Sequence, residues 1–408
     1  RIIKKLFIKM KCKITNDSIK PFMSFGKMPS ANGFLDKKDF DSEFFYEMEV
    51  GFSEKVSLFQ LNEFSNPKTV HNERYPFYTA SSENMKGHFK KYAEWLLKFY
   101  LDSHSKLIEV GSNDGTLLKN FSNTDVDYLG IEPSKSVADQ AIKNGIKTVN
   151  TFFNINSLNK MKNFKKKTDV ICAANVIAHI PNLKDLILTV DELLTSKGVF
   201  VFEEPYLGSM FDKTSYDQIY DEHIFMFSLS SVKKIFKLFD FDLIDAQPQL
   251  THGGSMRYVI GRKNKRKINP QIETMLDKEK KNKLDDLSSC LNFKKNCEDS
   301  KKRIIDSLKK FKEEGKKICG YAATAKSTTL LNYCNLNSDI ISFICDTTNE
   351  KIGKFSPGTH IPVVPMSHFY KNIPDVAYLF AWNHKEEIFA KEKKFLTNGG
   401  RWFSHVSL

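Results

Sequence analysis

The stretch Lys106–Leu118, KLIEVGSNDGTLL, decides the fold of this chain. A short apolar strand (107–110) runs into a turn with a glycine at each end (111–115), and two leucines then open a helix. In a doubly wound α/β sheet, a strand, a glycine-containing turn and a helix in this order bring a ligand close to the backbone. The stretch therefore predicts an α/β fold with a ligand site at the end of this strand. An unrelated Rossmann-like turn is the alternative.

Two features of this stretch argue against a dinucleotide. The glycines follow Gly-x-x-x-Gly spacing rather than Gly-x-Gly-x-x-Gly, and Glu109 lies at the end of the strand. A carboxylate repels a pyrophosphate but attracts the sulfonium and amino groups of S-adenosylmethionine (SAM). Roughly 20 residues later, the strand 128–131 ends in Glu132, which can accept hydrogen bonds from both ribose hydroxyls. The expected cofactor-binding residues are Glu109, Gly111, Asn113, Asp114, Gly115, Glu132, Pro133 and Asn175.

The bulk properties limit the classes of protein that remain. A chain of 408 residues is expected to form two or three domains, and no apolar run reaches the ~18 residues of a membrane span. Seven scattered cysteines without framework spacing indicate a reducing cytoplasm. The start lacks the apolar core of a signal peptide, and Met10 is a plausible true start with residues 1–9 upstream of it. A monomer and a homodimer both remain open.

The net charge of +13 raises the question of nucleic-acid binding. Much of the excess lies in residues 262–317, where lysines alternate with acids on helix-like stretches and only two aromatic residues, Phe293 and Phe311, occur. Such a pattern is typical of solvated helix faces, so a nucleic-acid partner is not expected. A basic surface does favour an anionic substrate such as a diphosphate.

Strands and helices alternate through the middle of the chain. A hairpin is expected in 44–61 and a helix over 82–100. Strands are predicted at 107–110, 128–132, 147–149, 169–174 and 198–202, with helices near 115–121, 134–144 and 183–194. A second α/β unit is predicted from a strand at 317–321, a helix over 322–333 and a strand at 340–345. The expected fold class is α/β, with a β-rich domain (10–80), a SAM-binding domain (81–262) and a Rossmann-like domain with leading charged helices (263–408).

Two polar motifs follow the predicted strands of the SAM domain. His179, in the motif NVIAHIPN, is either a core histidine or a group that faces substrate. The Asn/Asp-Pro-Pro-Tyr/Phe motif of many base methylases is missing there. The segment 213–227, KTSYDQIYDEHIFMF, places Tyr220 beside the pair Glu222 and His223. An imidazole with such neighbours can act as an acid or base near neutral pH, and a solvated polar loop is the alternative.

These motifs resemble one family. GSNDGTLL, NVIAHIP, EEPYLG, KTSYDQIYDEHIFMFS, HGGSMRY, GYAATAKSTTLLNYC and SPGTHIPV are similar to motifs of the sugar C-methyltransferases that act on nucleotide-linked 4-keto deoxysugars. The resemblance covers nearly the whole chain from Met10. It implies a small zinc-binding domain, a SAM domain and a Rossmann-like domain that helps to hold the nucleotide sugar.

The resemblance also assigns roles to residues. The implied catalytic residues are His223, Glu222, Tyr220, His179 and Tyr75, with Tyr78 as a rival for the last position. The residues expected to contact substrate are Lys326, Asn332, Tyr333, His360 and Arg257, the last of which is equally readable as a surface arginine.

The chemistry of carbon methylation fits these residues. A ketone acidifies the proton on the adjacent carbon, and His223, helped by Glu222, can remove that proton to leave an enolate. His179 or a tyrosine hydroxyl can then stabilise the enolate oxygen. N- or O-methylation of a related sugar and a non-catalytic SAM- or nucleotide-binding role are the alternatives.

The chain departs from the family at the zinc site. The family carries CxxC…CxxC, whereas here Cys12 is followed by Thr15, Ser53 and Val56 at the other three positions. One thiolate cannot hold a structural zinc, so we expect no zinc and an N-terminal domain held together by packing. Stoichiometric zinc, or unfolding by a chelator, would overturn this. Phe77 stands where a family tyrosine is expected, which bears on substrate fit.

Overall fold

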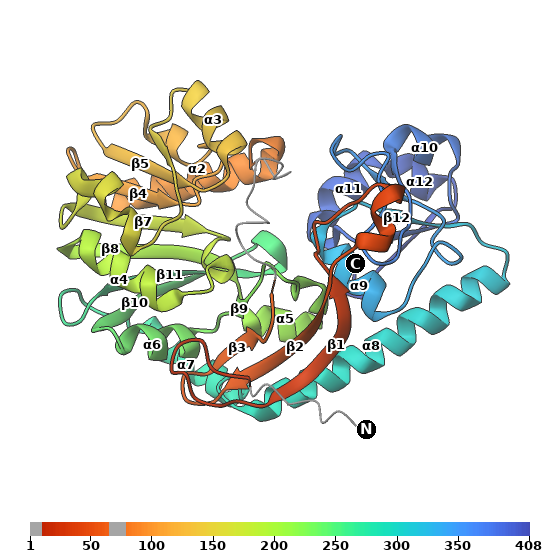
Figure 1. Cartoon of the computed structure of the whole chain (residues 1–408), viewed down its shortest axis with the longest axis horizontal. Helices are drawn as coiled ribbons and strands as arrows, with labels where there is room; N and C mark the ends of the chain where they lie inside the picture. Colours follow the sequence, from red (N-terminus) through yellow and green to blue (C-terminus); the bar gives the residue numbers. More distant parts are fainter. Residues whose placement is uncertain (1–9, 65–78) are drawn as a thin grey trace.

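The computed structural model describes residues 10–64 and 79–408. Its strands form three sheets. Figure 1 shows two lobes, each built on a largely parallel sheet, with β1, β2 and the long helix α8 running along one side from lobe to lobe.

The first lobe contains a seven-stranded sheet in the order β10-β11-β8-β7-β4-β5-β6. Its strands are β4 (Lys106–Val110), β5 (Asp127–Glu132), β6 (Thr148–Asn150), β7 (Thr168–Ala174), β8 (Leu194–Pro205), β10 (Phe241–Gln249) and β11 (Ser255–Arg262). Strands β4 to β8 pair in parallel, and β11 is inserted antiparallel between β8 and β10. This confirms the doubly wound α/β fold and the class I methyltransferase arrangement that the sequence predicts.

Helices and single turns connect these strands. They are η2 (Thr79–Ser81), α2 (Glu83–Phe99), η3 (Leu118–Phe121), α3 (Lys135–Lys143), η4 (Ile155–Phe164), η5 (Ile177–His179), α4 (Leu183–Leu193), α5 (Leu207–Lys213), η6 (Tyr216–Gln218), α6 (Leu229–Lys237) and η7 (Thr251–Gly253). Helix α2 begins where the Ser82 hydroxyl accepts a hydrogen bond from the Met85 N–H, an N-cap of the kind that serine favours.

The N-terminal residues form an antiparallel sheet in the order β1-β2-β3-β9. Its strands are β1 (Pro21–Pro29), β2 (Phe45–Ser53), β3 (Leu58–Leu61) and β9 (Phe225–Met226), and η1 (Lys37–Ser42) lies between β1 and β2. The expected hairpin is β2–β3. Strand β9 comes from the predicted catalytic segment 213–227, so this sheet holds that segment directly.

The second lobe contains a five-stranded parallel sheet in the order β14-β13-β12-β15-β16. Its strands are β12 (Ile318–Tyr321), β13 (Ile344–Asp346), β14 (Val363–Pro365), β15 (Val376–Leu379) and β16 (Arg401–Phe403). The helices that precede and surround it are α7 (Gln271–Lys281), α8 (Leu287–Glu313), α9 (Ala325–Tyr333), α10 (Met366–Lys371), η8 (Trp382–His384), α11 (Lys385–Lys391) and α12 (Lys393–Thr397). The Rossmann-like C-terminal unit is therefore confirmed as a fold, while the three domain boundaries remain a proposal.

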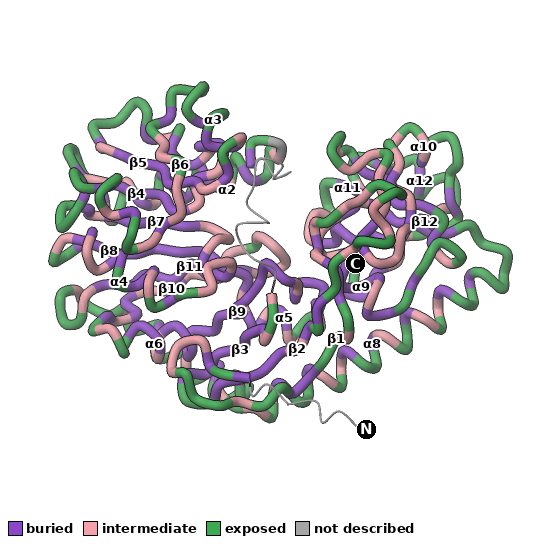
Figure 2. Tube along the Cα trace, in the orientation of Figure 1, coloured by how far each residue is buried: buried purple, intermediate pink, exposed green. Residues whose placement is uncertain are grey.

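Burial follows the sheets. Figure 2 shows buried residues along the central strands and exposed residues on the outer helices. One hydrophobic cluster joins β1 and β2 to α8 and to the second parallel sheet, through residues such as Phe25, Phe293 and Tyr333. The N-terminal sheet thus packs against the C-terminal lobe as well as the first lobe. None of the helices in the described residues combines the length and apolar character that a bilayer span requires.

Two local predictions were wrong. The helix expected over 115–121 is only the turn η3, because the Asn120 side chain donates to the carbonyl oxygens of Thr116 and Leu117 and closes the chain there. The strand expected over 340–345 begins at Ile344, because the amides of Ile340 and Ile341 bond back to the Asn337 carbonyl oxygen. The apolar side chains of that run are buried in a turn rather than a strand.

A buried ion pair lies between β8 and β11 of the first sheet. The Arg257 guanidinium contacts Glu203 Oε1 through Nε (2.6 Å) and Nη2 (2.5 Å), and it stacks on the rings of Tyr92 and Trp95. His88 Nε2 lies 2.6 Å from the other carboxylate oxygen. Arginine and glutamate are both almost completely buried.

We predict that Arg257→Met lowers the free energy of unfolding by about 3–5 kcal/mol, because it leaves Glu203 buried without its main partner. The matched control is Lys263→Met, which removes an exposed lysine 3.8 Å from Asp240 and should cost at most about 1 kcal/mol. Urea denaturation followed by circular dichroism measures both. Equal costs would contradict the assignment of Arg257 as a structural residue.

Candidate active site

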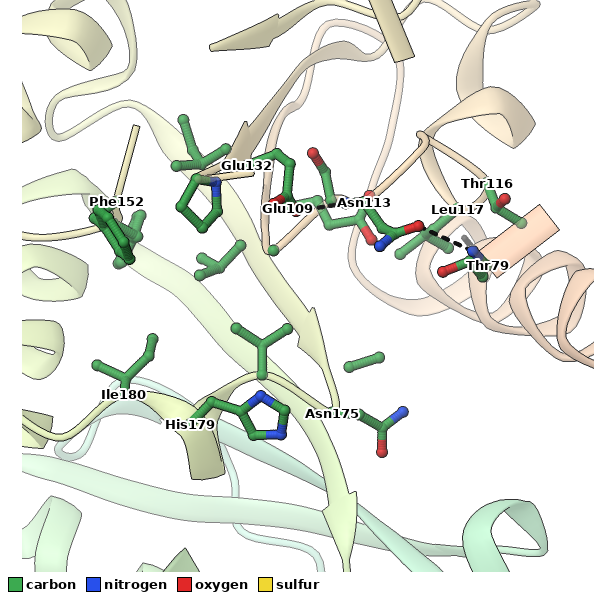
Figure 3. A pocket seen from close by; sticks show the side chains of 18 of the residues that line it. Thr79, Glu109, Asn113, Thr116, Leu117, Glu132, Phe152, Asn175, His179 and Ile180 are labelled. Carbon is green, nitrogen blue, oxygen red and sulfur yellow. Dashed lines mark hydrogen bonds between the residues drawn. The ribbon is translucent and has the colours of Figure 1, made fainter. Parts of the chain in front are cut away.

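A cavity of about 420 Å³ opens at the carboxyl ends of β4, β5 and β7. Figure 3 shows Glu109, Asn113 and Glu132 gathered on one side of it and Asn175 and His179 on the other. The lining includes seven of the residues expected from sequence: Glu109, Gly111, Asn113, Glu132, Pro133, Asn175 and His179. This volume is within the usual range of small-molecule sites.

The turn after β4 has a shape that requires glycine. Gly111 has a φ of +66°, and a Cβ atom there would lie 2.4 Å from Val176 Cγ2. The Asn113 N–H donates to Glu132 Oε2 (3.0 Å), and the Ser134 N–H donates to Oε1 (2.7 Å). The carboxylate at the end of β5 is thereby aimed at the cavity by backbone bonds.

Two of the expected cofactor residues support the turn from outside the cavity. Asp114 Oδ2 accepts from the Ala80 N–H, and Gly115 packs against Ile146 with a φ of +80°. Asn113 both lines the cavity and supports the turn, because its Oδ1 accepts a hydrogen bond from the Thr79 N–H. These bonds hold the beginning of α2 beside the turn.

The cavity contains polar atoms that fit a cationic, polar ligand such as SAM. Both Glu109 and Asn175 line the cavity. Glu109 Oε2 and Asn175 Oδ1 are buried and have no hydrogen-bond partner among the described residues. Burial, with the neighbouring carboxylates of Asp114 and Glu132, raises the pKa of Glu109 well above its usual range. A bound cation would stabilise the ionised form of Glu109, which burial and the two neighbouring carboxylates disfavour. The residues present therefore fit the sulfonium or ammonium group of SAM.

His179 is held at the cavity wall by a buried carboxylate. It ends the turn η5, whose first backbone N–H groups point at Glu204 Oε1: Val176 at 2.9 Å, Ile177 at 2.6 Å and Ala178 at 3.2 Å. Burial raises the pKa of Glu204 to about 8 despite these bonds. Glu204 is therefore a positioning residue that sequence analysis did not single out.

His223 lies beside His179, with 5.2 Å between the two ring centroids. Its Nδ1 is 2.6 Å from the Gln218 carbonyl oxygen, which can only accept, so Nδ1 carries the proton. Its Nε2 is 2.8 Å from the Tyr220 hydroxyl and offers a lone pair. Burial lowers the pKa of His223 to about 4, so the ring is neutral at pH 7 and available as a base.

Glu222 is the third member of this cluster. One of its oxygens lies 4.0 Å from His179 Nδ1, and the other accepts a hydrogen bond from the Asn32 side chain of the N-terminal domain. Burial, reinforced by the adjacent Asp221, raises the pKa of Glu222 to about 7, against the opposing effect of Lys351. The structure thus brings His179, Glu222 and His223 together with Tyr220, as expected from sequence.

The fifth residue of the expected catalytic group lies outside the described residues. Tyr75, its rival Tyr78 and the neighbouring Phe77 belong to 65–78. The role of Tyr75 remains a prediction.

Three of the five expected substrate residues, Lys326, Asn332 and Tyr333, lie on α9. Lys326 is enclosed near the catalytic segment, with Nζ 3.3 Å from Asn383 Oδ1 and 5.0 Å from the centre of the Trp382 ring. Asn332 bonds to the carbonyl oxygens of Thr328 and Pro357, and Tyr333 packs on Phe25.

His360 and Arg257 lie in other contacts. His360 stacks on Phe40 and bonds to Glu43 Oε2 at 2.7 Å, joining the N-terminal and C-terminal parts. Arg257 belongs to the buried ion pair described above. Of the five, Lys326 is the enclosed cation that suits an anionic substrate.

The four positions at which the resemblance implies zinc ligands are Cys12, Thr15, Ser53 and Val56. Cys12 and Val56 are buried members of one hydrophobic cluster. Ser53, three residues before Val56, is also buried. A thiol, two hydroxyls and a valine do not provide the donor set that zinc requires. Within the described residues no group of three or more His, Cys, Asp or Glu side chains could hold a metal ion.

Comparison with known proteins agrees with this geometry. A family model described as a methyltransferase domain matches residues 83–246, and one described as a C-methyltransferase C-terminal domain matches residues 250–406. This protein is a SAM-dependent methyltransferase. Among its relatives, the C-methyltransferase NovU of Streptomyces niveus is 27% identical over 383 residues, which cover 93% of this chain and 91% of NovU.

Two solved structures align with less than half of this chain. The PH0226 protein of Pyrococcus horikoshii OT3 is 14% identical, with 46% of this chain and 95% of that chain covered and a TM-score of 0.37. The magnesium protoporphyrin IX methyltransferase (ChlM) of Synechocystis PCC 6803, with bound SAH, is 12% identical, with 43% and 83% covered and a TM-score of 0.34.

Some lining residues of the methyltransferase were missed from sequence. They are Thr79, Met85, Phe89, Phe152, Phe153, Asn154 and His252, among others. Phe152 and Phe153 directly follow β6, so the rule that ligands bind at the carboxyl ends of strands could have found them. His252 comes from the HGGSMRY motif, and within residues 10–64 and 79–408 its buried Nε2 has no hydrogen-bond partner. Nothing in its local sequence indicates that η7 folds back to the cavity.

We predict that Gly111→Ala weakens binding of the product S-adenosylhomocysteine (SAH) by at least about 10-fold, because the added Cβ displaces Val176 from the cavity wall. The matched control is Gly145→Ala, which has the same positive φ strain (+80°) but meets no atom within 4 Å. Isothermal titration calorimetry measures both affinities. An unchanged affinity in Gly111→Ala would show that the donor does not bind against this turn.

Proposed function

We propose that this methyltransferase methylates C-3, the carbon next to the ketone of a nucleotide-diphosphate 4-keto-deoxysugar. The observation that carries the proposal is the neutral His223, whose ring lies 5.2 Å from that of His179 on the wall of the donor cavity. A methyl acceptor with an ordinary lone pair has less need of such a base. A carbon acid cannot react without one.

The proton transfer follows from the hydrogen bonds of His223. Its Nε2 lone pair takes the proton from C-3, and the C–H electron pair becomes the enolate of the C-4 ketone. In the ligand-free protein the Tyr220 hydroxyl donates a hydrogen bond to that lone pair, so this bond has to break when the substrate binds. The Gln218 carbonyl keeps Nδ1 protonated, so only Nε2 can accept.

The charges formed in this step have partners in the site. We assign the stabilisation of the His223 imidazolium to the carboxylate of the preceding residue, Glu222, which is about half ionised at pH 7 because its pKa is about 7. Asp217 also favours the charged ring. The enolate oxygen needs a donor, a role that we assign to His179 or a tyrosine hydroxyl, and each good donor contributes roughly 3–4 kcal/mol. When bound, SAM supplies an electrophilic methyl group and departs as SAH.

The substrate class is supported by charge and by similarity. Lys326 and Lys351 are enclosed cations beside the catalytic segment, and Lys351 Nζ donates to the Ala323 carbonyl oxygen at 2.7 Å. Burial lowers the pKa of both lysines, and a diphosphate would favour their charged forms. Carbon as the acceptor is supported by the name of NovU and by the C-terminal family model. The 4-keto-deoxysugar is supported by the motif resemblance.

We predict that His223→Asn slows exchange of the C-3 proton by about 10²–10⁴-fold, the usual contribution of a general base. The assay incubates dTDP-, GDP- or CDP-linked 4-keto-6-deoxyhexose with the enzyme and SAH in D₂O and follows deuterium at C-3 by NMR. Lys263→Met is the control, because that exposed residue is remote from the site. If His223→Asn methylated its substrate at the wild-type rate, N- or O-methylation would replace the proposal.

The pH dependence of this exchange distinguishes the two titrating groups. The pKa of His223 is about 4, so the base stays neutral from pH 8 to pH 6. Glu222 loses its charge as the pH falls through about 7, and the exchange rate should fall with it. In Glu222→Gln the rate should be lower and nearly flat between pH 6 and pH 8. A fall centred near 6.5 that persists in Glu222→Gln would contradict the neutral, buried base.

A further inference from the structure

The catalytic segment is bound to the C-terminal lobe by a buried carboxylate. Asp217, in η6, accepts a hydrogen bond from Trp382 Nε1 at 2.7 Å, and its Oδ1 lies 3.0 Å from His405 Nε2. Their exposed fractions are 1% for Asp217, 5% for Trp382 and 3% for His405. These two partners lie 165 and 188 positions further along the chain. Burial alone would raise the pKa of Asp217, but His405, Lys326 and Trp382 hold it below its usual range, so the carboxylate is charged.

The residue after Asp217 supplies the bond that orients the base. The Gln218 carbonyl oxygen accepts from His223 Nδ1, while the Gln218 side chain donates to Ser215 Oγ at 2.8 Å. On the other side, Thr329 of α9 donates its hydroxyl to the Ile219 carbonyl oxygen at 2.7 Å. The C-terminal lobe therefore holds the backbone immediately before and immediately after the carbonyl that His223 contacts.

Trp382 also touches the first lobe at the donor cavity. Its ring lies over Gly253, where a Cβ atom would come within 2.1 Å of Cη2. Gly253 follows His252, which lines the cavity. One indole thus contacts the turn before the base and the wall of the donor site.

We propose that Trp382 and His405 are positioning residues for the base: through Asp217 they fix the Gln218 carbonyl that keeps His223 in its Nδ1-protonated form. The inference rests on the proposed role of His223 for its effect on rate, but the form of the imidazole is measurable without any substrate. The C-terminal lobe then acts in the proton transfer even though none of its side chains is required to touch the reacting carbon.

The test compares Trp382→Phe and His405→Gln with Trp402→Phe. Trp382→Phe keeps an aromatic ring but removes the N–H that bonds to Asp217. Trp402→Phe removes an indole N–H of the same lobe that has no hydrogen-bond partner in the part of the chain that the structure describes. ¹⁵N-histidine spectra of the ligand-free proteins report which nitrogen of His223 carries the proton, with His223→Gln used to assign the signal. SAH affinity reports whether the donor site remains intact.

We expect the wild type and Trp402→Phe to show a single neutral form protonated at Nδ1. Trp382→Phe and His405→Gln should show a mixture of both neutral forms, with SAH affinity unchanged and C-3 exchange slower by about 10-fold to 100-fold. Wild-type spectra in both variants would overturn the inference. A shifted spectrum together with full exchange activity in His223→Asn would instead uphold the positioning contact and reject the proposed function, so the two failures are distinguishable.

Discussion

The hydrogen bond from His223 Nδ1 to the Gln218 carbonyl oxygen is the contact on which the rest of the site depends. A buried imidazole is a useful base only while it is neutral and its lone pair faces the substrate. Burial supplies the first condition by lowering the pKa to about 4, and the carbonyl supplies the second by holding the proton on Nδ1. The turn that carries this carbonyl is short, so its position has to come from other parts of the chain.

All three sheets contribute to that position. Strand β9, directly after His223, pairs with β3 of the N-terminal sheet, and Asn32 of the same domain bonds to Glu222. The first lobe supplies Glu204, which holds the turn that ends at His179. The C-terminal lobe holds Asp217. This explains why a methyltransferase sheet is combined here with two further units that pack against the same 15-residue segment.

Local features of the molecule could be predicted from sequence, and contacts between distant segments could not. The strand and glycine turn at 106–115 and the polar cluster Tyr220–His223 are each encoded within a few neighbouring residues. The bonds from Asp217 to Trp382 and His405, and from Asn32 to Glu222, join positions more than 160 residues apart and leave no local pattern. The role of His360 toward substrate stays a prediction, and its contact with the N-terminal domain could not be predicted from sequence. Its loop looks suited to a ligand, yet the ring stacks on Phe40 of the N-terminal domain.

The most direct test of carbon methylation is the position of the transferred methyl group. The enzyme would be incubated with SAM labelled with ¹³C in its methyl group and with dTDP-, GDP- and CDP-linked 4-keto-6-deoxyhexoses, and the products examined by heteronuclear NMR. The account predicts a labelled methyl bonded to C-3 with one of these nucleotides. A label on oxygen or nitrogen, or no transfer to any of the three, would contradict it.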